Sequence, residues 1–281
     1  MVASSRRPAA LPNSRSATLR SLWLLAVCAA ALFFPFLGCK KKPPSKPQPR
    51  AGSRPSPSRA PGTPSLAIII DDLGHDRAAA DSLFALPFPL TISVLPHLLQ
   101  SSLVAQEAQR RGEEVLLHLP MEPDSPAAEP EATELRVGMN SSQVESLLAG
   151  MLETVPNAVG VNNHQGSRAT ADATLMEALM PSLRRRGLFF IDSRTTAATV
   201  AYDTAERLGV RAASRRVFLD DSPTRQAILA QLDRAAADAL RDGEAIAIGH
   251  PRPATISALA EGVPRIEARG IRLVFASSLV H

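Results

Sequence analysis

The stretch Leu66-Ala-Ile-Ile-Ile-Asp-Asp-Leu-Gly74 decides the fold expected for this chain. Its five apolar residues run without a polar interruption, which is typical of a strand buried on both faces of a parallel α/β sheet. The Pro/Gly/Ser-rich residues 61–65 mark where that strand begins. The adjacent acids Asp71 and Asp72 therefore lie at the carboxyl end of a buried strand.

Apolar runs and helical patterns alternate from residue 65 to the end of the chain. Strands are expected at 66–70, 90–94, 115–117, 158–161, 188–191, 210–213 or 217–219, 245–248 and 271–275. Helices are expected at 101–111, 141–152, 171–186, 199–208, 224–241 and 255–268. This alternation predicts one α/β domain over residues 65–281, a parallel (β/α) barrel of about seven strands. An open doubly wound sheet is the alternative.

Charge is divided unevenly along the chain. Residues 1–64 contain eleven Lys or Arg and no acid, whereas the remainder has 20 basic and 27 acidic residues. A basic tail ahead of an acidic domain suits attraction to an anionic membrane surface, because a nucleic-acid-binding protein carries its basic patch on the folded domain. No nucleic-acid partner is expected.

The N-terminus is typical of an exported bacterial protein. Four arginines precede the apolar segment 22–37, and Phe36-Leu37-Gly38-Cys39 resembles a lipoprotein lipobox, in which Cys39 would be lipidated. Residues 1–39 are expected to form a signal peptide, lipoprotein signal or uncleaved membrane anchor. The Pro/Lys/Arg-rich residues 40–64 are expected to form a disordered linker. Either processing route leaves the domain tethered to the membrane and facing the periplasm.

Polar residues follow several of the expected strands. Asp71 and Asp72 follow the first strand, and His118, His164, Asp192 and His250 follow later ones. In a parallel barrel these strand ends open on one face, where active sites are built. An acid after a strand is often only a turn or cap residue, and Asp220 and Asp221 ahead of Ser222-Pro223 fit that role. Histidine has no such turn role, and three of the six histidines occupy strand ends.

These residue types suit hydrolysis assisted by a metal ion. Two histidines and one carboxylate around an open position form the ligand set of hydrolytic zinc sites. A second carboxylate can accept a proton, and a further histidine can protonate a leaving group. The chain has no Walker loop, no G-x-G-x-x-G after the first strand and no G-x-S-x-G nucleophile elbow.

Five blocks of the chain resemble the divergent polysaccharide deacetylase family, relatives of the NodB-homology carbohydrate deacetylases. They are IIIDDLG at 68–74, EVLLHLPMEP at 114–123, GVNNHQGS at 160–167, FFIDSRT at 189–195 and AIGHP at 247–251. The resemblance implies a distorted (β/α) barrel and hydrolysis of acetyl groups, aided by a divalent metal such as zinc, on a cell-envelope glycan such as peptidoglycan.

The resemblance also implies roles for single residues. Asp71 would be the general base, Asp72 and His118 metal ligands, His250 the general acid, and Asp192 the acid that orients a catalytic partner, with Arg194 beside it as a charge partner. Where the second histidine of the family's H-x-x-x-H motif belongs, this chain has Glu122. Either Glu122 ligates the metal or His164 supplies the imidazole, and His164 is favoured because it restores an Asp-His-His set.

Two departures keep a second interpretation open. The family's arginine-proline motif is absent, and the region after residue 64 has no Trp and only Tyr202 for stacking against sugar rings. The alternative to an enzyme is a catalytically impaired barrel that binds a glycan or protein in the cell envelope. The proline-rich stretch 120–138 is expected to be a loop near the site.

Overall fold

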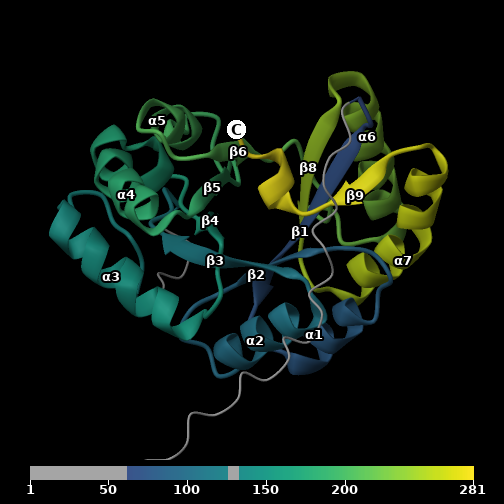
Figure 1. The fold of residues 1–281 in the computed structure, drawn as a ribbon, viewed down its shortest axis with the longest axis horizontal. Coiled ribbons are helices and arrows are strands. Elements are labelled where there is room, and N and C mark those ends of the chain that lie inside the picture. Colours follow the sequence, from purple (N-terminus) through teal and green to yellow (C-terminus); the bar gives the residue numbers. More distant parts are fainter. Residues whose placement is uncertain (1–61, 126–132) are drawn as a thin grey trace, which may run out of the picture. The chain divides into compact units, whose positions relative to one another are not determined.

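Figure 1 shows the fold in a computed structural model, which describes residues 62–125 and 133–281. The signal, lipidation and anchor predictions for residues 1–39, and nearly all of the linker, lie outside the described residues. Within the described ranges, no helix combines the length and the apolar character needed to span a bilayer.

Strands and helices alternate along the described part of the chain. The strands are β1 (Ser65–Leu73), β2 (Thr91–Val94), β3 (Glu114–Met121), β4 (Gly160–Gln165), β5 (Phe189–Asp192), β6 (Ala212–Ser214), β7 (Val217–Phe218), β8 (Glu244–Gly249) and β9 (Arg272–Val274). The helices are α1 (Arg77–Phe84), α2 (Ser101–Arg111), α3 (Ser141–Thr154), α4 (Ala173–Arg186), α5 (Ala201–Arg207), α6 (Arg225–Asp242) and α7 (Pro253–Ala268), with short 3-10 turns η1 (Ala169–Ala171) and η2 (Ala276–Leu279).

All the strand pairs are parallel, and the strands follow one another around a distorted barrel. Their order is β6-β5-β4-β3-β2-β1-β8-β7, and β9 pairs with the first half of β1. A doubly wound sheet would reverse direction at an inner strand, so this order excludes that alternative. The barrel stays open, because β6 and β7 stand at the two ends of the order and do not pair. The seven α-helices lie outside the strands (Figure 1).

The C-terminal segment closes the barrel interior at the end opposite the carboxyl ends of the strands. Inward side chains of β1, β3, β5, β6, β8 and β9 form one buried cluster with Ala276, Leu279 and Val280. The last residue is held at β6, where the backbones of Ala212 and His281 exchange two hydrogen bonds of 3.0 and 3.2 Å. This packing leaves the opposite end of the barrel, at the carboxyl ends of the strands, for a site.

The expected elements are largely confirmed, with three differences. Both 210–213 and 217–219, which were alternatives for one strand, contribute strands, β6 and β7, so the described residues form nine strands where about seven were expected. Helix α1 was not expected; it has only eight residues and begins at an Asp76 cap that a loop could equally carry. The expected loop 120–138 starts later, because β3 continues to Met121, which pairs with Leu135.

Candidate metal and catalytic site

The polar strand-end residues share the inward face of the barrel. Side chains alternate between the two faces of a strand, so every second residue points into the barrel. Where apolar residues at alternate positions point inward, the polar residue two positions further along also points inward. The inward series are Ala67-Ile69-Asp71 on β1, Leu116-His118 on β3, Gly160-Asn162-His164 on β4 and Ile246-Ile248-His250 on β8. Four distant parts of the chain thus bring their polar groups to one end of the barrel interior.

A bulge in β1 explains how two adjacent acids both reach this site. Between Ile70 and Leu73, β1 advances three residues while its partner β2 advances two. Such an extra residue breaks the alternation of side chains. Asp72 takes the left-handed backbone conformation, φ 58°, which Asp tolerates better than most residues but which still costs energy. Strain of this kind is typical of functional sites.

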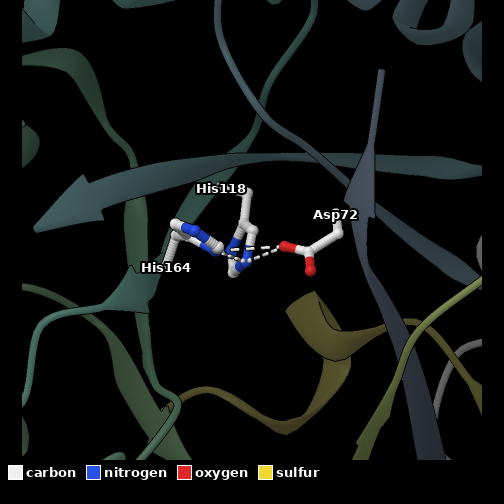
Figure 2. A group of neighbouring side chains, drawn as sticks. All are labelled: Asp72, His118 and His164. Carbon is white, nitrogen blue, oxygen red and sulfur yellow. Dashed lines mark hydrogen bonds and ion pairs between the residues drawn. The ribbon is translucent and has the colours of Figure 1, made fainter. Parts of the chain in front are cut away.

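Asp72, His118 and His164 bring three ligand atoms together, as Figure 2 shows. Asp72 Oδ1 lies 3.2 Å from His118 Nε2 and 3.0 Å from His164 Nδ1, and the two nitrogens lie 3.1 Å apart. Asp72 Oδ1 is buried, and in the described part of the chain it has no hydrogen-bond partner of good geometry. Three atoms that can act as metal ligands therefore face one point.

The triangle has the dimensions that a divalent metal needs. In a tetrahedral zinc site with bonds of about 2.0 Å, neighbouring ligand atoms are about 3.3 Å apart. The three separations in the triangle, 3.0 to 3.2 Å, fall just below that value. Burial would raise the pKa of Asp72, but the two imidazoles beside it hold that pKa well below its usual range. Asp72 is thus an anion, as a ligand must be.

Asn162 was not assigned a role from the sequence, yet it lies at the centre of the hydrogen bonds. Its Oδ1 accepts from Ser93 Oγ at 2.6 Å and pairs with His118 Nδ1 at 3.0 Å, while its Nδ2 donates to Asp71 Oδ1 at 2.8 Å. Since the amide oxygen can only accept, His118 Nδ1 carries a proton, so Nε2 is the nitrogen whose lone pair a metal would use when the ring loses its second proton. Asn162 is two positions before His164 on β4, so the alternation of side chains along this strand could have placed it on the inward face from the sequence.

Asp71 lies beside the triad without belonging to it. Its Oδ2 is 3.6 Å from His118 Nε2, and the side chain is buried. Burial raises the pKa of Asp71 above its ordinary value, although the charge of His118 opposes the effect. Burial alone would lower the pKa of His118, but the charges of Asp71 and Asp72 raise it to about 9.

His250 is oriented by Asp220 and not by Asp192. Asp220 Oδ1 pairs with His250 Nδ1 at 2.9 Å, and Oδ2 accepts from the backbone of His250 and from Thr255 Oγ1, both at 2.8 Å. Burial would lower the pKa of His250, but the bond to Asp220 and the charge of Asp72 raise it. His250 Nε2 then points toward Asp72, 3.5 Å from Oδ2. Asp220 was expected to be only a turn or cap residue, but it also orients the His250 ring.

Asp192 lies outside the barrel interior and does not orient His250; its orientation of another partner stays a prediction. Phe189 and Ile191 face the barrel interior, so Asp192 has the opposite parity. Its carboxylate accepts from the backbone of Arg194 and from Thr199 Oγ1, both at 2.8 Å, and orients no histidine within the described residues. Asp192 instead organises the turn that follows β5.

The two candidates for the third ligand lie in different places. His164 is in the triad, whereas Glu122 accepts hydrogen bonds from Arg168 at 2.9 Å and from the backbone of Val137 at 2.8 Å. The geometry favours His164. A cleft of about 650 Å³ opens over the triad, Asp71 and His250. None of the described residues of the loop 120–138 lines it.

Solved structures share this fold. The chain matches the protein ATU2773 of Agrobacterium tumefaciens C58 with a TM-score of 0.75 and 27% identity, covering 82% of this chain and 93% of that one. It also matches the catalytic domain of a peptidoglycan N-acetylglucosamine deacetylase from Eubacterium rectale with a TM-score of 0.50, 15% identity and coverage of 79% and 92%. At that identity the likeness concerns the fold alone.

Two relatives are similar in sequence. An uncharacterized protein of Haemophilus influenzae is 41% identical over 198 residues, 70% of each chain. The Escherichia coli protein YibQ is 41% identical over 217 residues, 77% of this chain and 67% of YibQ. Residues 68–280 match the family described as divergent polysaccharide deacetylase, which confirms the resemblance carried by the five sequence blocks. The chain therefore belongs to the divergent polysaccharide deacetylase family.

Proposed function

We propose that this protein is a metal-dependent hydrolase that removes acetyl groups from a cell-envelope glycan. The observation that carries the proposal is the triangle of Asp72, His118 and His164 in a cleft that also holds Asp71 and His250. Membership of a polysaccharide deacetylase family supports the class of reaction. Peptidoglycan is a substrate to test, because a peptidoglycan N-acetylglucosamine deacetylase has the same fold.

Asp72, His118 and His164 would hold the metal, with zinc as the expected ion. When bound, such an ion polarises a carbonyl group and lowers the pKa of water. Asn162 keeps the His118 ring in the tautomer that leaves Nε2 available, and it also fixes the Asp71 carboxylate. The positions of a ligand and of the neighbouring base are thus tied to one amide.

Asp71 and His250 would handle the protons. Asp71 is the general base in this proposal, because its raised pKa makes the buried carboxylate a better proton acceptor than an ordinary aspartate. His250 is the general acid, because its Nδ1 is occupied by Asp220 and its raised pKa keeps a proton available at Nε2 for the leaving amine or alkoxide. Asp220 acts here as a positioning residue.

Export and membrane tethering are part of the proposal and are supported by the sequence of residues 1–64 alone. Their basic residues, apolar segment and lipobox-like end suit a domain that is held at the periplasmic face of a membrane. Such a place would give the cleft access to the cell-envelope glycan.

The test combines metal content with acetate release. Full-length protein purified in detergent is stripped with a chelator and reloaded with zinc, and bound metal is counted by mass spectrometry. Acetate is then measured after incubation with peptidoglycan and with chito-oligosaccharides. We expect one zinc per chain and zinc-dependent acetate release. His164→Ala should lose both, whereas the matched control Glu122→Gln should keep both.

Asp71→Asn separates the enzyme from a binding protein. This variant should still bind zinc and glycan, but it should release acetate at least 100-fold more slowly, since a general base contributes about 10²–10⁴ in rate. No metal binding, or no acetate release with any divalent ion, would refute the proposed enzyme. Glycan binding without any acetate release by the wild type would favour the impaired glycan-binding barrel.

A further inference from the structure

Four arginines line the cleft that holds the metal triad. Arg194 comes from the loop after β5, Arg215 and Arg216 form the link between β6 and β7, and Arg234 lies on α6. Residues 65–281 have 20 basic and 27 acidic residues, so this domain is acidic as a whole. The four arginines are therefore a local cluster of positive charge on a domain that is acidic overall.

The end of β5 fixes two of these arginines in place. Asp192 is fully buried; its Oδ1 accepts from the backbone N–H of Arg194 at 2.8 Å, and its carbonyl accepts from that of Arg215 at 2.9 Å. Arg194 takes the left-handed backbone conformation, φ 49°. A bulky residue rarely adopts this conformation without compensation. Asp192, for which the sequence predicted another role, thus presents arginines to the cleft.

Arg215 is held by backbone carbonyls and forms no direct ion pair among the described residues, although the carboxylates of Asp192 and Asp71 act on it at longer range. Its Nε donates to the carbonyl of Ser193 at 2.6 Å and its Nη2 to that of Arg194 at 2.9 Å. Its guanidinium lies over the Phe218 ring, 5.2 Å from the centroid, and that ring packs edge-on against His250. Partial burial lowers the pKa of Arg215. A partly desolvated cation of this kind is stabilised by an anion that enters the cleft.

The other charges of the cleft leave room for an anion. Arg216 is shared with Asp242 at 3.4 Å, and the carboxylates that line the cleft are Asp221 and, at the triad, Asp71 and Asp72. No ion pair is formed by the side chains of Arg194 and Arg234 within the described ranges. A second hollow of about 620 Å³ shares Arg194, Arg215 and Arg216 with the cleft. The arginines therefore stand where a longer ligand would pass from one hollow to the other.

We propose that the substrate is an acylated saccharide that also carries an oxyanion, a carboxylate or a phosphate, which Arg194 and Arg215 bind while the acetyl group lies at the triad. This rests on the proposed function and names its substrate class. The planar guanidinium suits both oxyanions, since it offers paired N–H donors. Ionic contacts also replace the aromatic stacking that the region after residue 64, with Tyr202 and no Trp, does not supply.

The test compares ligands that differ in charge. Binding to zinc-loaded full-length protein is measured by calorimetry with three probes: the disaccharide of N-acetylglucosamine and N-acetylmuramic acid, which has a carboxylate; neutral diacetylchitobiose; and N-acetylglucosamine 6-phosphate. We expect the charged probes to bind about tenfold or more tightly than diacetylchitobiose, as one charge-assisted contact provides. The stronger charged probe identifies the oxyanion, and added NaCl should weaken it selectively.

Variants locate the effect. Arg194→Gln and Arg215→Gln should each reduce the preference for the charged probes at least severalfold, whereas Arg207→Gln, which removes an exposed ion pair with Glu177, should not. Equal affinity for neutral and charged probes, or a preference that survives both changes, would overturn the proposal. Charge-selective binding without acetate release would support this site and refute the hydrolase. Acetate release that does not depend on the charge of the substrate would support the hydrolase and refute the arginine site.

Discussion

Gly160 provides a stability test of the barrel interior. A Cβ atom at this position would lie 2.5 to 2.6 Å from three atoms of the Phe189 ring, where an ordinary contact is at least 3.4 Å. Phe189 is almost fully buried in the interior cluster, so the ring cannot move aside without displacing its neighbours. Overpacking of this kind costs about 1–3 kcal/mol. Gly160→Ala should therefore lower the free energy of unfolding by about that amount and the melting temperature by several degrees.

Gly150 offers the matched control. It lies in α3, and an added Cβ there would meet no atom within 4 Å. Gly150→Ala should raise the free energy of unfolding by about 0.5–1 kcal/mol, because alanine loses less backbone entropy in a helix. Unfolding in urea, followed by circular dichroism, measures both variants. In the double variant Gly160→Ala/Phe189→Leu the costs should be less than additive, since the ring that clashes is gone. An equally stable Gly160→Ala protein would refute the packing described for β4 and β5.

Three further outcomes are expected from the site. Asp220→Asn, unfolded with a chelator present, should cost about 1.5–3 kcal/mol near pH 5. The pKa of Asp220 is lowered from 3.8 and that of His250 is raised from 6.5, so both groups are charged between these two pKa values. The cost of the substitution should therefore shrink in alkaline solution, because the ion pair is lost as the pH rises through the raised pKa of His250. A cost independent of pH would contradict this pairing. Asp72→Ala should unfold more easily than Asp72→Asn by about 1 kcal/mol, because alanine tolerates the positive φ less well, and identical unfolding curves would argue against strain. Asn162→Ala should weaken zinc binding about 10–100-fold in competition with a chelating dye, whereas unchanged affinity would remove its role in orienting His118.

The class of fold and the places of most strands and helices could be predicted from the sequence, because each buried run is bounded by turn residues and separated from the next by a helical pattern, but the strand order could not. Local pattern could not show whether the barrel closes. That depends on β6 and β7, which have three and two residues and are held by pairing partners far along the chain. The eight-residue α1 was missed for a similar reason, since its stability comes from packing and not from length.

The convergence of His118, His164 and His250 could be predicted from their residue type at strand ends, whereas their roles stay predictions. Asp192 and Asp220 show the limit of residue type alone, because both follow an apolar run and precede a serine one or two positions later. Parity separates them: the inward series Phe189-Ile191 excludes Asp192 from the interior. Asp220 reaches His250 through the neighbouring strand β8, a contact between residues 30 positions apart that no local pattern contains.

The open seam of the barrel connects the two halves of the proposed site. A closed barrel of eight strands has an interior that its own side chains fill. Here β6 and β7 do not pair, and the two-residue link between them, Arg215-Arg216, lines both the cleft over the triad and the second hollow, which extends along the seam to the start of β8. The feature that keeps the barrel open thus provides both the space for a ligand beside the triad and the positive charge that would select it. Closing the seam would remove the two together, so we expect substrate selectivity to depend on this link more than on the metal ligands.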